Sequence, residues 1–214
     1  MEREDSFDTE DGRIFQIIQR EETAVLWSPE VHFGPDPNRL CTMPKMGEQL
    51  KFLYVVEDLG RGADGNVVLA CTKEAKATCA IKFFYRHMNE TVETRNMRVE
   101  KEKAVWHKVY PELEKKVRVE RWRGQDALVM PYLSQAVERD NDATRTAVQK
   151  TLKRYADNHI KHDDVRWANI GFYDQDGELA AVLFDCVRVT EMPNWDQKDK
   201  ENWVRECLEK LKVP

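Results

Sequence analysis

Three glycines between two strand-like runs could hold a phosphate group. Gly60, Gly62 and Gly65 belong to the stretch Gly-Arg-Gly-Ala-Asp-Gly-Asn-Val, which fits G-x-G-x-x-G-x-V and ends at Val67. Glycines let a backbone fold closely over a triphosphate and offer N–H donors without a Cβ in the way. Glycine turns between strands are common, so this pattern alone is weak. A dinucleotide-binding fold would place a helix directly after the glycines, and the strand-like run found there disfavours that fold.

A lysine with apolar neighbours follows on another strand-like run. Lys82 ends the tripeptide Ala-Ile-Lys, and taken alone it is most simply an edge residue that points to solvent. A lysine that binds phosphate inside a cleft needs a carboxylate to hold its amine. Glu102 fits best, because apolar residues follow it at +3, +4 and +7 and turn that helix face towards the protein. Glu100 is the second candidate.

Carboxylate and amide side chains gather in a third stretch. His162, Asp164 and Asn169 fit H-x-D-x-x-x-x-N, and Asp185 follows after two further apolar runs. A metal site is the less favoured interpretation of the neighbouring His159, His162, Asp163 and Asp164, where a hydrogen-bonded structural histidine is expected.

Five strands and one helix are predicted around the glycines and the lysine. Apolar runs bounded by turn residues predict the strands, and a charged stretch with few breakers predicts a helix over residues 90–107. Short connections, including a polar turn at residues 73–76, predict an antiparallel meander of the first three strands. The predicted strands are residues 52–56, 66–71, 79–84, 117–122 and 127–130.

Two helices and a hairpin are predicted in the last third of the chain. Asn141 or Asp142 could cap a helix that continues to about residue 158. Residues 170–173 and 181–184 flank an Asp-Gln-Asp-Gly turn, which is typical of a hairpin. Residues 203–211 have the spacing of an amphipathic helix. We expect an N-terminal extension over residues 1–50 and two parts over residues 51–133 and 134–214.

Within the extension, only coarse predictions are made. The acidic first dozen residues are expected to be mobile, and residues 14–18 and 24–27 to form short strands. Residues 28–45 contain four prolines and are expected to form an irregular connection.

Composition argues against several classes of function. The 34 basic and 39 acidic residues give a net charge of −5 without a basic stripe, so no nucleic-acid partner is expected. The five cysteines form no C-x-x-C pair, which predicts reduced thiols rather than zinc or disulfides. The acidic N-terminus does not resemble a secretory signal, and no apolar run approaches the roughly 18 residues of a membrane span. We expect a cytoplasmic protein without a membrane partner.

Taken in order, these motifs resemble those of the protein-kinase superfamily over residues 52–190. The ordered set is the glycine pattern, Ala-x-Lys, a helix glutamate, H-x-D-x-x-x-x-N and a final aspartate. The stretch Asp-Val-Arg-Trp-Ala-Asn-Ile is similar to divergent kinase-like domains such as those of Crinkler-type effectors of oomycetes and fungi, for which delivery into a host cell is an open alternative. The resemblance implies an α+β bilobal fold, with a five-stranded antiparallel N-lobe plus one helix and a reduced helical C-lobe. Mg·ATP would bind in the cleft between the lobes.

The resemblance also assigns roles in phosphoryl transfer. Asp164 would orient the attacking hydroxyl and accept its proton, and Arg166 would stabilise the transferring phosphoryl. Lys82, fixed by Glu102, would bind the α- and β-phosphates, and Mg²⁺ would be held by Asn169 and Asp185.

The nucleotide itself would contact a second group of residues. Gly60, Gly62 and Gly65 would cover the phosphates, while Val67 and Ala80 would form an apolar roof over the adenine. Met130 would border the adenine pocket. Backbone groups would meet the base around Pro131, Tyr132 and Leu133.

Four features depart from the family pattern. Asp163 replaces an arginine that reads activation-loop phosphorylation in many kinases, and Cys186-Val187 replaces Phe-Gly, which weakens the usual in/out switch. Gly171 stands where a larger apolar residue normally floors the adenine. Only 29 residues follow Asp185, without an A-P-E signature, so the terminal helix is expected to cover the core that a substrate lobe normally covers.

These motifs predict a Mg·ATP-dependent phosphotransferase, with a protein hydroxyl as acceptor favoured over a small molecule. Two alternatives stay open: a nucleotide-binding pseudokinase that works as an interaction module, and a small-molecule kinase of the aminoglycoside or choline type. ATP and a protein substrate or partner are the expected partners.

Overall fold

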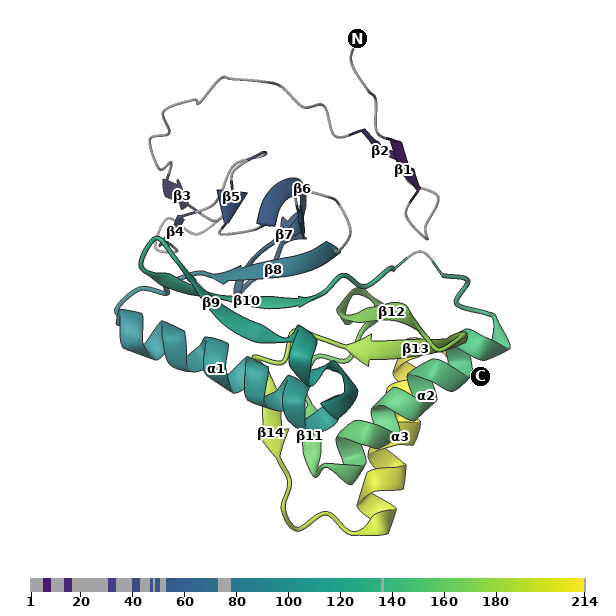
Figure 1. Ribbon diagram of the computed structural model, residues 1–214. Coiled ribbons are helices and arrows are strands. Elements are labelled where there is room, and N and C mark those ends of the chain that lie inside the picture. Colours follow the sequence, from purple (N-terminus) through teal and green to yellow (C-terminus); the bar gives the residue numbers. More distant parts are fainter. Residues whose placement is uncertain are drawn as a thin grey trace.

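The computed structural model describes residues 53–72, 78–135 and 137–213, together with Gly47 and five short strands before residue 51. These strands are β1 (Ser6–Asp8), β2 (Ile14–Gln16), β3 (Val31–Phe33), β4 (Leu40–Thr42) and β5 (Gln49–Leu50). Figure 1 shows a sheet with one helix beneath it and, to the lower right, two further helices with a hairpin.

A single antiparallel sheet carries the glycines and the lysine. Its order is β5-β6-β7-β8-β10-β9, so the predicted meander of the first three strands is confirmed and β5 adds two residues at one edge. The register of β6 shifts between Val55 and Glu57 and again between Asp58 and Gly60. These bulges let β6 continue into the glycine segment, five residues beyond the predicted end. The five long strands are β6 (Leu53–Arg61), β7 (Gly65–Thr72), β8 (Thr78–Phe84), β9 (Arg118–Trp122) and β10 (Gln125–Pro131).

Helix α1 (Val92–Val109) connects β8 to the last two strands of the sheet and packs beneath it (Figure 1). Thr91 caps its first turn by accepting a hydrogen bond from the N–H of Thr94 at 3.2 Å. Its buried residues recur at helical spacing and include one glutamate: Arg95, Val99, Glu102, Val105, Trp106 and Val109. The short 3-10 helix η1 (Pro111–Lys116) follows, because proline starts a new turn more readily than it continues a helix.

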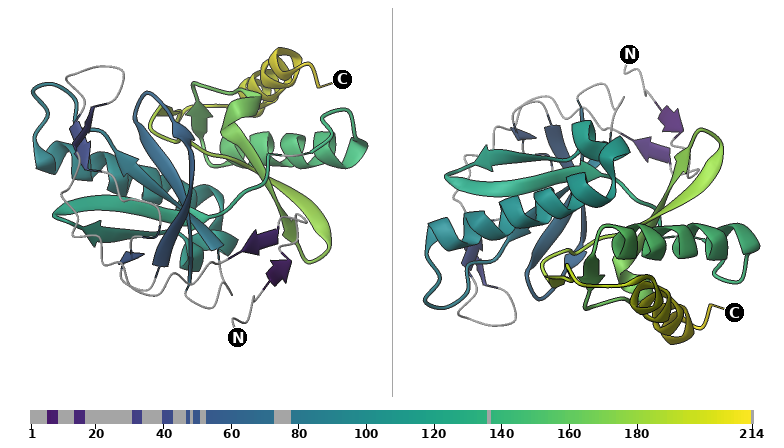
Figure 2. Two further views of the ribbon diagram at one scale, coloured as in Figure 1. Left: turned by 90° about the horizontal axis from the view of Figure 1, so that it is seen from above. Right: turned by 90° about the horizontal axis from the view of Figure 1, so that it is seen from below.

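Helices α2 (Asp142–Asp157) and α3 (Gln197–Leu211) pack against each other in the second part. Asn141 caps α2, as predicted, by accepting from the N–H of Ala143 at 2.7 Å. Asp196 and Asp199 form a reciprocal capping box at the start of α3. The predicted amphipathic face of α3 is confirmed, with Trp203, Val204, Cys207 and Leu211 buried. Figure 2 shows α2 and α3 on one side of the molecule and the sheet with α1 on the other.

Two small strand pairs complete the second part. The predicted hairpin is confirmed as β12 (Ile170–Gln175) and β13 (Glu178–Leu183). Strands β11 (Ile160–His162) and β14 (Val189–Glu191) pair antiparallel on either side of it in the sequence, and the 3-10 turn η2 (Trp167–Asn169) precedes β12. Neither β11 nor β14 was predicted, because three residues are too few to show a strand period.

One expectation for the extension is confirmed in part and another is wrong. The strand predicted at residues 14–18 is present as Ile14–Gln16, which pairs with Ser6–Asp8. Val31–Phe33 pairs with Leu40–Thr42 inside the stretch expected to be irregular. In both cases a pair of three-residue strands flanks an Asp-Gly or Gly-Pro turn signal. The strand predicted at residues 24–27 and the turn at residues 73–76 lie outside the described residues.

Two apolar clusters lie on opposite faces of the sheet. The larger joins α1, α2, α3 and β13 and contains Trp106, Leu152, Leu183 and Trp203. The smaller contains Ile81 and Phe83, which flank the cleft lysine and point the other way because side chains alternate along a strand. None of the helices in the described part of the chain has the length and apolarity needed to cross a membrane.

Candidate functional site

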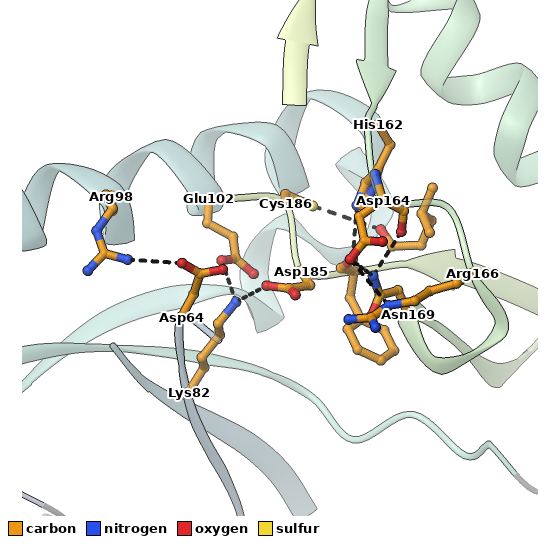
Figure 3. A network of polar contacts seen from close by, with 12 residues as sticks. Asp64, Lys82, Arg98, Glu102, His162, Asp164, Arg166, Asn169, Asp185 and Cys186 are labelled. Atoms are coloured by element: carbon orange, nitrogen blue, oxygen red, sulfur yellow. Dashed lines mark hydrogen bonds and ion pairs between the residues drawn. The ribbon is translucent and has the colours of Figure 1, made fainter. Parts of the chain in front are cut away.

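A cleft of about 760 Å³ lies between the sheet and the loop formed by residues 162–169 (Figure 3). Asp164 is not among its lining residues, but the structure brings every other predicted site residue to its wall. Those residues are Gly60, Gly62, Gly65, Val67, Ala80, Lys82, Glu102, Met130, Tyr132, Leu133, Arg166, Asn169 and Asp185.

The glycine loop, residues 60–65, requires glycine for two different reasons. Gly60 has a φ of 136°, a conformation that side chains with a Cβ rarely adopt. At Gly65, a Cβ would lie 2.3 Å from the carbonyl oxygen of Phe83, because β7 and β8 approach closely there. Gly62 instead closes the loop, donating its N–H to the carbonyl of Gly65 at 2.8 Å.

Asp64 ties the glycine loop to helix α1, a contact that sequence reasoning missed. Its Oδ1 lies 3.7 Å from Nη1 of Arg98, and 3.6 Å from Nε2 of His87. Its carbonyl also accepts the N–H of Tyr85 at 3.0 Å. Arg98 is anchored in turn by Glu90, with Nε 2.8 Å from Oε1. Arg98 lies one turn before Glu102, so the loop and the glutamate are supported by the same helix (Figure 3).

Lys82 lies between two carboxylates at the base of the cleft. Its Nζ is 2.8 Å from Oε2 of Glu102 and 2.6 Å from Oδ1 of Asp185 (Figure 3). Glu102 is completely buried, whereas 28% of the Asp185 side chain is exposed. Glu100, the second candidate for this partner, is wrong: it is exposed and pairs with Lys103 at 2.7 Å. Of the two candidates, Glu102 is therefore the one that contacts Lys82.

The charges of this group follow from their burial and their pairing. Burial alone would lower the pKa of Lys82, but Glu102 and Asp185 together raise it above its usual range, so the amine stays protonated. Burial would raise the pKa of Asp185, and Lys82 outweighs that effect and lowers it. Burial raises the pKa of Glu102, and Lys82 offsets only part of the rise. Glu102 therefore depends on Lys82 to remain charged.

His162 forms hydrogen bonds to the backbone of two residues, Asp164 and Phe184. Its Nε2 donates to the carbonyl of Phe184 at 3.0 Å, while its Nδ1 accepts the N–H of Asp164 at 3.2 Å. Burial lowers its pKa, which keeps the imidazole neutral. Both ring nitrogens are occupied, so the structural interpretation of this histidine is favoured over a metal ligand. Among the residues that the structure describes, no group of three or more His, Cys, Asp or Glu could hold a metal ion.

Asp164, Asn169 and Arg166 form a compact polar group in the 162–169 loop. Asn169 Nδ2 donates to the backbone carbonyl of Asp164 at 2.8 Å and to its Oδ2 at 3.1 Å. Arg166 Nε lies 3.2 Å from the same Oδ2. The amide oxygen of Asn169 and Oδ2 of Asp185 make no hydrogen bond within the described ranges. Two free oxygens suit Mg²⁺, which commonly takes one or two protein oxygens and completes its shell with phosphate and water.

At the other end of the cleft, Leu133 fills the space above Gly171. A Cβ on Gly171 would lie 2.5 Å from Cβ of Leu133, so the small residue on β12 is matched by a large one on the facing segment. Ser134 and Phe172 exchange two backbone hydrogen bonds of 2.9 and 2.8 Å beside this contact. Leu133 therefore fills the space that a larger residue at position 171 would need. Leu59 also lines the cleft and was missed, although it stands directly before the first glycine.

Trp167 connects the 162–169 loop to helix α3. Its indole Nε1 donates to the carbonyl of Leu211 at 2.9 Å, which satisfies one of the last carbonyls of the helix. The guanidinium of Arg139 lies 5.1 Å from the centre of the Trp167 ring. Helix α3 thus supports the loop directly.

Residues 58–173 match the model of a family described as a family of unknown function, DUF5898. This match spans more than half of the 214-residue chain. The chain belongs to DUF5898. No curated protein sequence matches this DUF5898 chain.

Solved kinase domains are similar to the DUF5898 chain in fold. The crystal structure of the PF14_0431 kinase domain matches with a TM-score of 0.51 and 15% identity, over 72% of this chain and 56% of that domain. A double mutant of the PknI kinase domain from Mycobacterium tuberculosis gives a TM-score of 0.46 and 20% identity, over 71% and 66%. The DUF5898 chain therefore spans little more than half of the first domain. It has the predicted protein-kinase-like α+β fold with a reduced C-lobe.

Proposed function

We propose that this DUF5898 chain is a Mg·ATP-dependent phosphotransferase whose acceptor is a protein hydroxyl. The observation that carries the proposal is the position of Lys82, held by Glu102 at 2.8 Å and by Asp185 at 2.6 Å in the cleft that the glycine loop borders. A buried cation beside a loop of glycine N–H groups is suited to a triphosphate.

Each group in the cleft has a task in this proposal. Lys82 binds the α- and β-phosphates, and the free oxygens of Asn169 and Asp185 hold Mg²⁺. The metal supplies charge neutralisation on the phosphates and a template for in-line transfer. Asp164 orients the acceptor hydroxyl and accepts its proton, while Arg166, which already contacts Asp164 at 3.2 Å, neutralises the transferring phosphoryl.

The adenine end is open to backbone recognition. Leu133 makes no backbone hydrogen bond among the described residues, so its N–H and C=O are free to meet a base. Met130 and Tyr132 border the same end of the cleft, with Val67 and Ala80 on the facing sheet. An apolar pocket with a few free backbone groups is typical of a nucleotide-base site.

Radiolabelled ATP with Mg²⁺ tests the proposal. Wild-type protein should label itself or a generic acceptor protein, and Asp164→Ala should lose transfer by about 10²-fold or more while still binding nucleotide. Asp163→Ala is the matched control, because that aspartate is exposed and accepts a hydrogen bond from Thr190 at 2.8 Å outside the cleft. Wild-type protein that binds no nucleotide would refute the proposal.

A pseudokinase is the second candidate, and one observation favours it. Asp164 lies outside the cleft wall and its Oδ2 is engaged by both Asn169 and Arg166. In that case Mg·ATP would bind normally but neither wild type nor Asp164→Ala would transfer phosphate. A third candidate, a small-molecule kinase, predicts ADP release with aminoglycosides, choline or sugars and no protein labelling.

The narrower family likeness, the location, the absence of a nucleic-acid partner and the division of the chain rest on the sequence alone. The similarity to Crinkler-type effectors rests on the stretch from Asp164 to Ile170. A cytoplasmic location, the absence of a nucleic-acid partner and the division at residues 50 and 133 stay predictions from composition and pattern.

A further inference from the structure

Two buried tyrosines bind residues 183–186, the segment that contains Asp185. Tyr155 Oη donates to the carbonyl of Leu183 at 2.7 Å, and the N–H of Leu183 donates to Oη of Tyr110 at 2.8 Å. Both tyrosines and Leu183 are fully buried. The hydroxyl at the C-cap of α1 and the hydroxyl on α2 therefore both bind the backbone of Leu183, two positions before Asp185.

Tyr155 also contacts the residue directly after Asp185. Its Oη lies 3.1 Å from Sγ of Cys186, which is itself fully buried. The thiol also donates to the carbonyl of Leu183 at 3.9 Å, so Tyr155, Leu183 and Cys186 form one hydrogen-bonded group. The hydroxyl of Tyr155 thus contacts the residues two before and one after Asp185.

A column of rings links helix α1 to the 162–169 loop through the same tyrosines. Ring centres lie 5.6 Å apart for Trp106 and Tyr110, 6.2 Å for Tyr110 and Tyr155, and 5.6 Å for Tyr155 and His162. His162 then holds the carbonyl of Phe184 at 3.0 Å. The column thus begins one turn after Glu102 and ends beside Asp185.

Asp185 needs such support, because its backbone is in an unfavourable conformation. Its φ is 63°, in the left-handed region that residues other than glycine rarely occupy. A residue stays in that region only when its surroundings hold it there. The hydrogen bonds to Leu183, Phe184 and Cys186 are those surroundings.

We propose that Tyr155, assisted by Tyr110, is a positioning residue that keeps Asp185 directed at Lys82 and the metal. The metal part of this inference rests on the proposed function, and the positioning of residues 183–186 does not. Tyr155 keeps this segment in one arrangement, so Asp185 does not need nucleotide to reach it.

Tyr155→Phe tests the inference, because it retains the ring and removes only the hydroxyl. Tyr173→Phe is the control, since its hydroxyl contacts Gln175 at 3.2 Å and Glu112 at 3.4 Å, and neither belongs to residues 183–186. Calorimetric titration with a non-hydrolysable ATP analogue should show that Tyr155→Phe weakens the Mg²⁺-dependent affinity about tenfold or more, as for other residues that orient metal ligands. Affinity without Mg²⁺ should stay the same.

Thiol labelling gives a second readout that needs neither metal nor nucleotide. N-ethylmaleimide should modify Cys186 faster in Tyr155→Phe than in Tyr173→Phe, with Cys207 on α3 as an internal reference for global opening. Tyr110→Phe should show the same change in weaker form and replaces Tyr155→Phe if that variant does not fold.

The two readouts separate the possible failures. If wild type binds no nucleotide but Cys186 is labelled faster in Tyr155→Phe, the proposed function fails and the positioning of residues 183–186 is supported. Labelling and Mg²⁺ dependence equal to those of Tyr173→Phe would overturn the inference.

Discussion

Lys82→Met should destabilise the protein far more than the same change at Lys103. Methionine at position 82 would leave Glu102, which is completely buried, without the cation that lies 2.8 Å away. Lys103 forms a pair of similar length, 2.7 Å, with Glu100, but that glutamate side chain is 55% exposed. The two substitutions therefore remove the cation from the same type of partner, a glutamate that is buried in one case and exposed in the other.

The expected difference can be worked from burial. Removing one member of a buried ion pair costs about 3–5 kcal/mol, because the remaining charge is left in an apolar site. An exposed pair on one helix contributes about 0.3–0.5 kcal/mol. In a chain of this length, 1 kcal/mol lowers Tm by about 2–4 °C. Lys82→Met should thus lower Tm by about 6–20 °C and Lys103→Met by about 2 °C or less.

The loss of stability caused by Lys82→Met should also depend on pH. Burial raises the pKa of Glu102 above 4.5, and removing Lys82 raises it further. The folded carboxylate then binds its proton more tightly than the unfolded one, so the loss is smallest below pH 4.5 and grows as the pH rises through the raised pKa. The double variant Lys82→Met/Glu102→Leu should recover most of the stability, because an apolar replacement of a buried pair is close to neutral.

Thermal and urea unfolding of the four proteins between about pH 4 and pH 8 provides the measurement. The reasoning is refuted if Lys82→Met and Lys103→Met lower Tm equally. It is also refuted if the double variant is no more stable than Lys82→Met at neutral pH.

Three further perturbations probe the rest of the site. Gly171→Ala should lower the free energy of unfolding by about 1–3 kcal/mol in urea titrations, because its Cβ would lie 2.5 Å from Cβ of Leu133; adding Leu133→Ala should restore little of the loss, since alanine keeps that Cβ. His162→Gln should reduce the pH dependence of stability below pH 6.5. Burial lowers the pKa of His162 in the folded protein, so the unfolded imidazole takes up a proton first and the wild type loses stability as the pH falls. Unfolding measured across that pH range tests this. Asp64→Asn should speed hydrogen exchange at residues 62–65, since its carboxylate lies 3.7 Å from Arg98; exchange equal to that of Glu100→Gln would argue against the tie.

Local patterns were sufficient to predict most of the fold. The five long strands and three helices are regular over at least five residues, and their periods are visible in the sequence. Glu102 was chosen over Glu100 on helical spacing alone, and the structure places it on the buried face of α1. Strands β11 and β14 could not be predicted, because three residues pair there through contacts made late in the chain.

Several features of the site depend on partners that no local pattern reveals. Gly171 looked like a missing floor, and only the facing Leu133 shows what fills it. Tyr155 is one of several buried residues of α2, and its hydroxyl acquires a role only when Leu183 and Cys186 are brought to it. The contact between Asp64 and Arg98 could not be predicted either, because the two residues lie on different elements.

The contact between Trp167 and Leu211 also affects how the chain matures during synthesis. The two residues are 44 positions apart, and a ribosome adding about 5–20 residues per second needs roughly 2–9 s to cover that distance. During this interval the 162–169 loop has been made, but its supporting carbonyl has not. The cleft therefore acquires its final rigidity late, after helix α3 has docked.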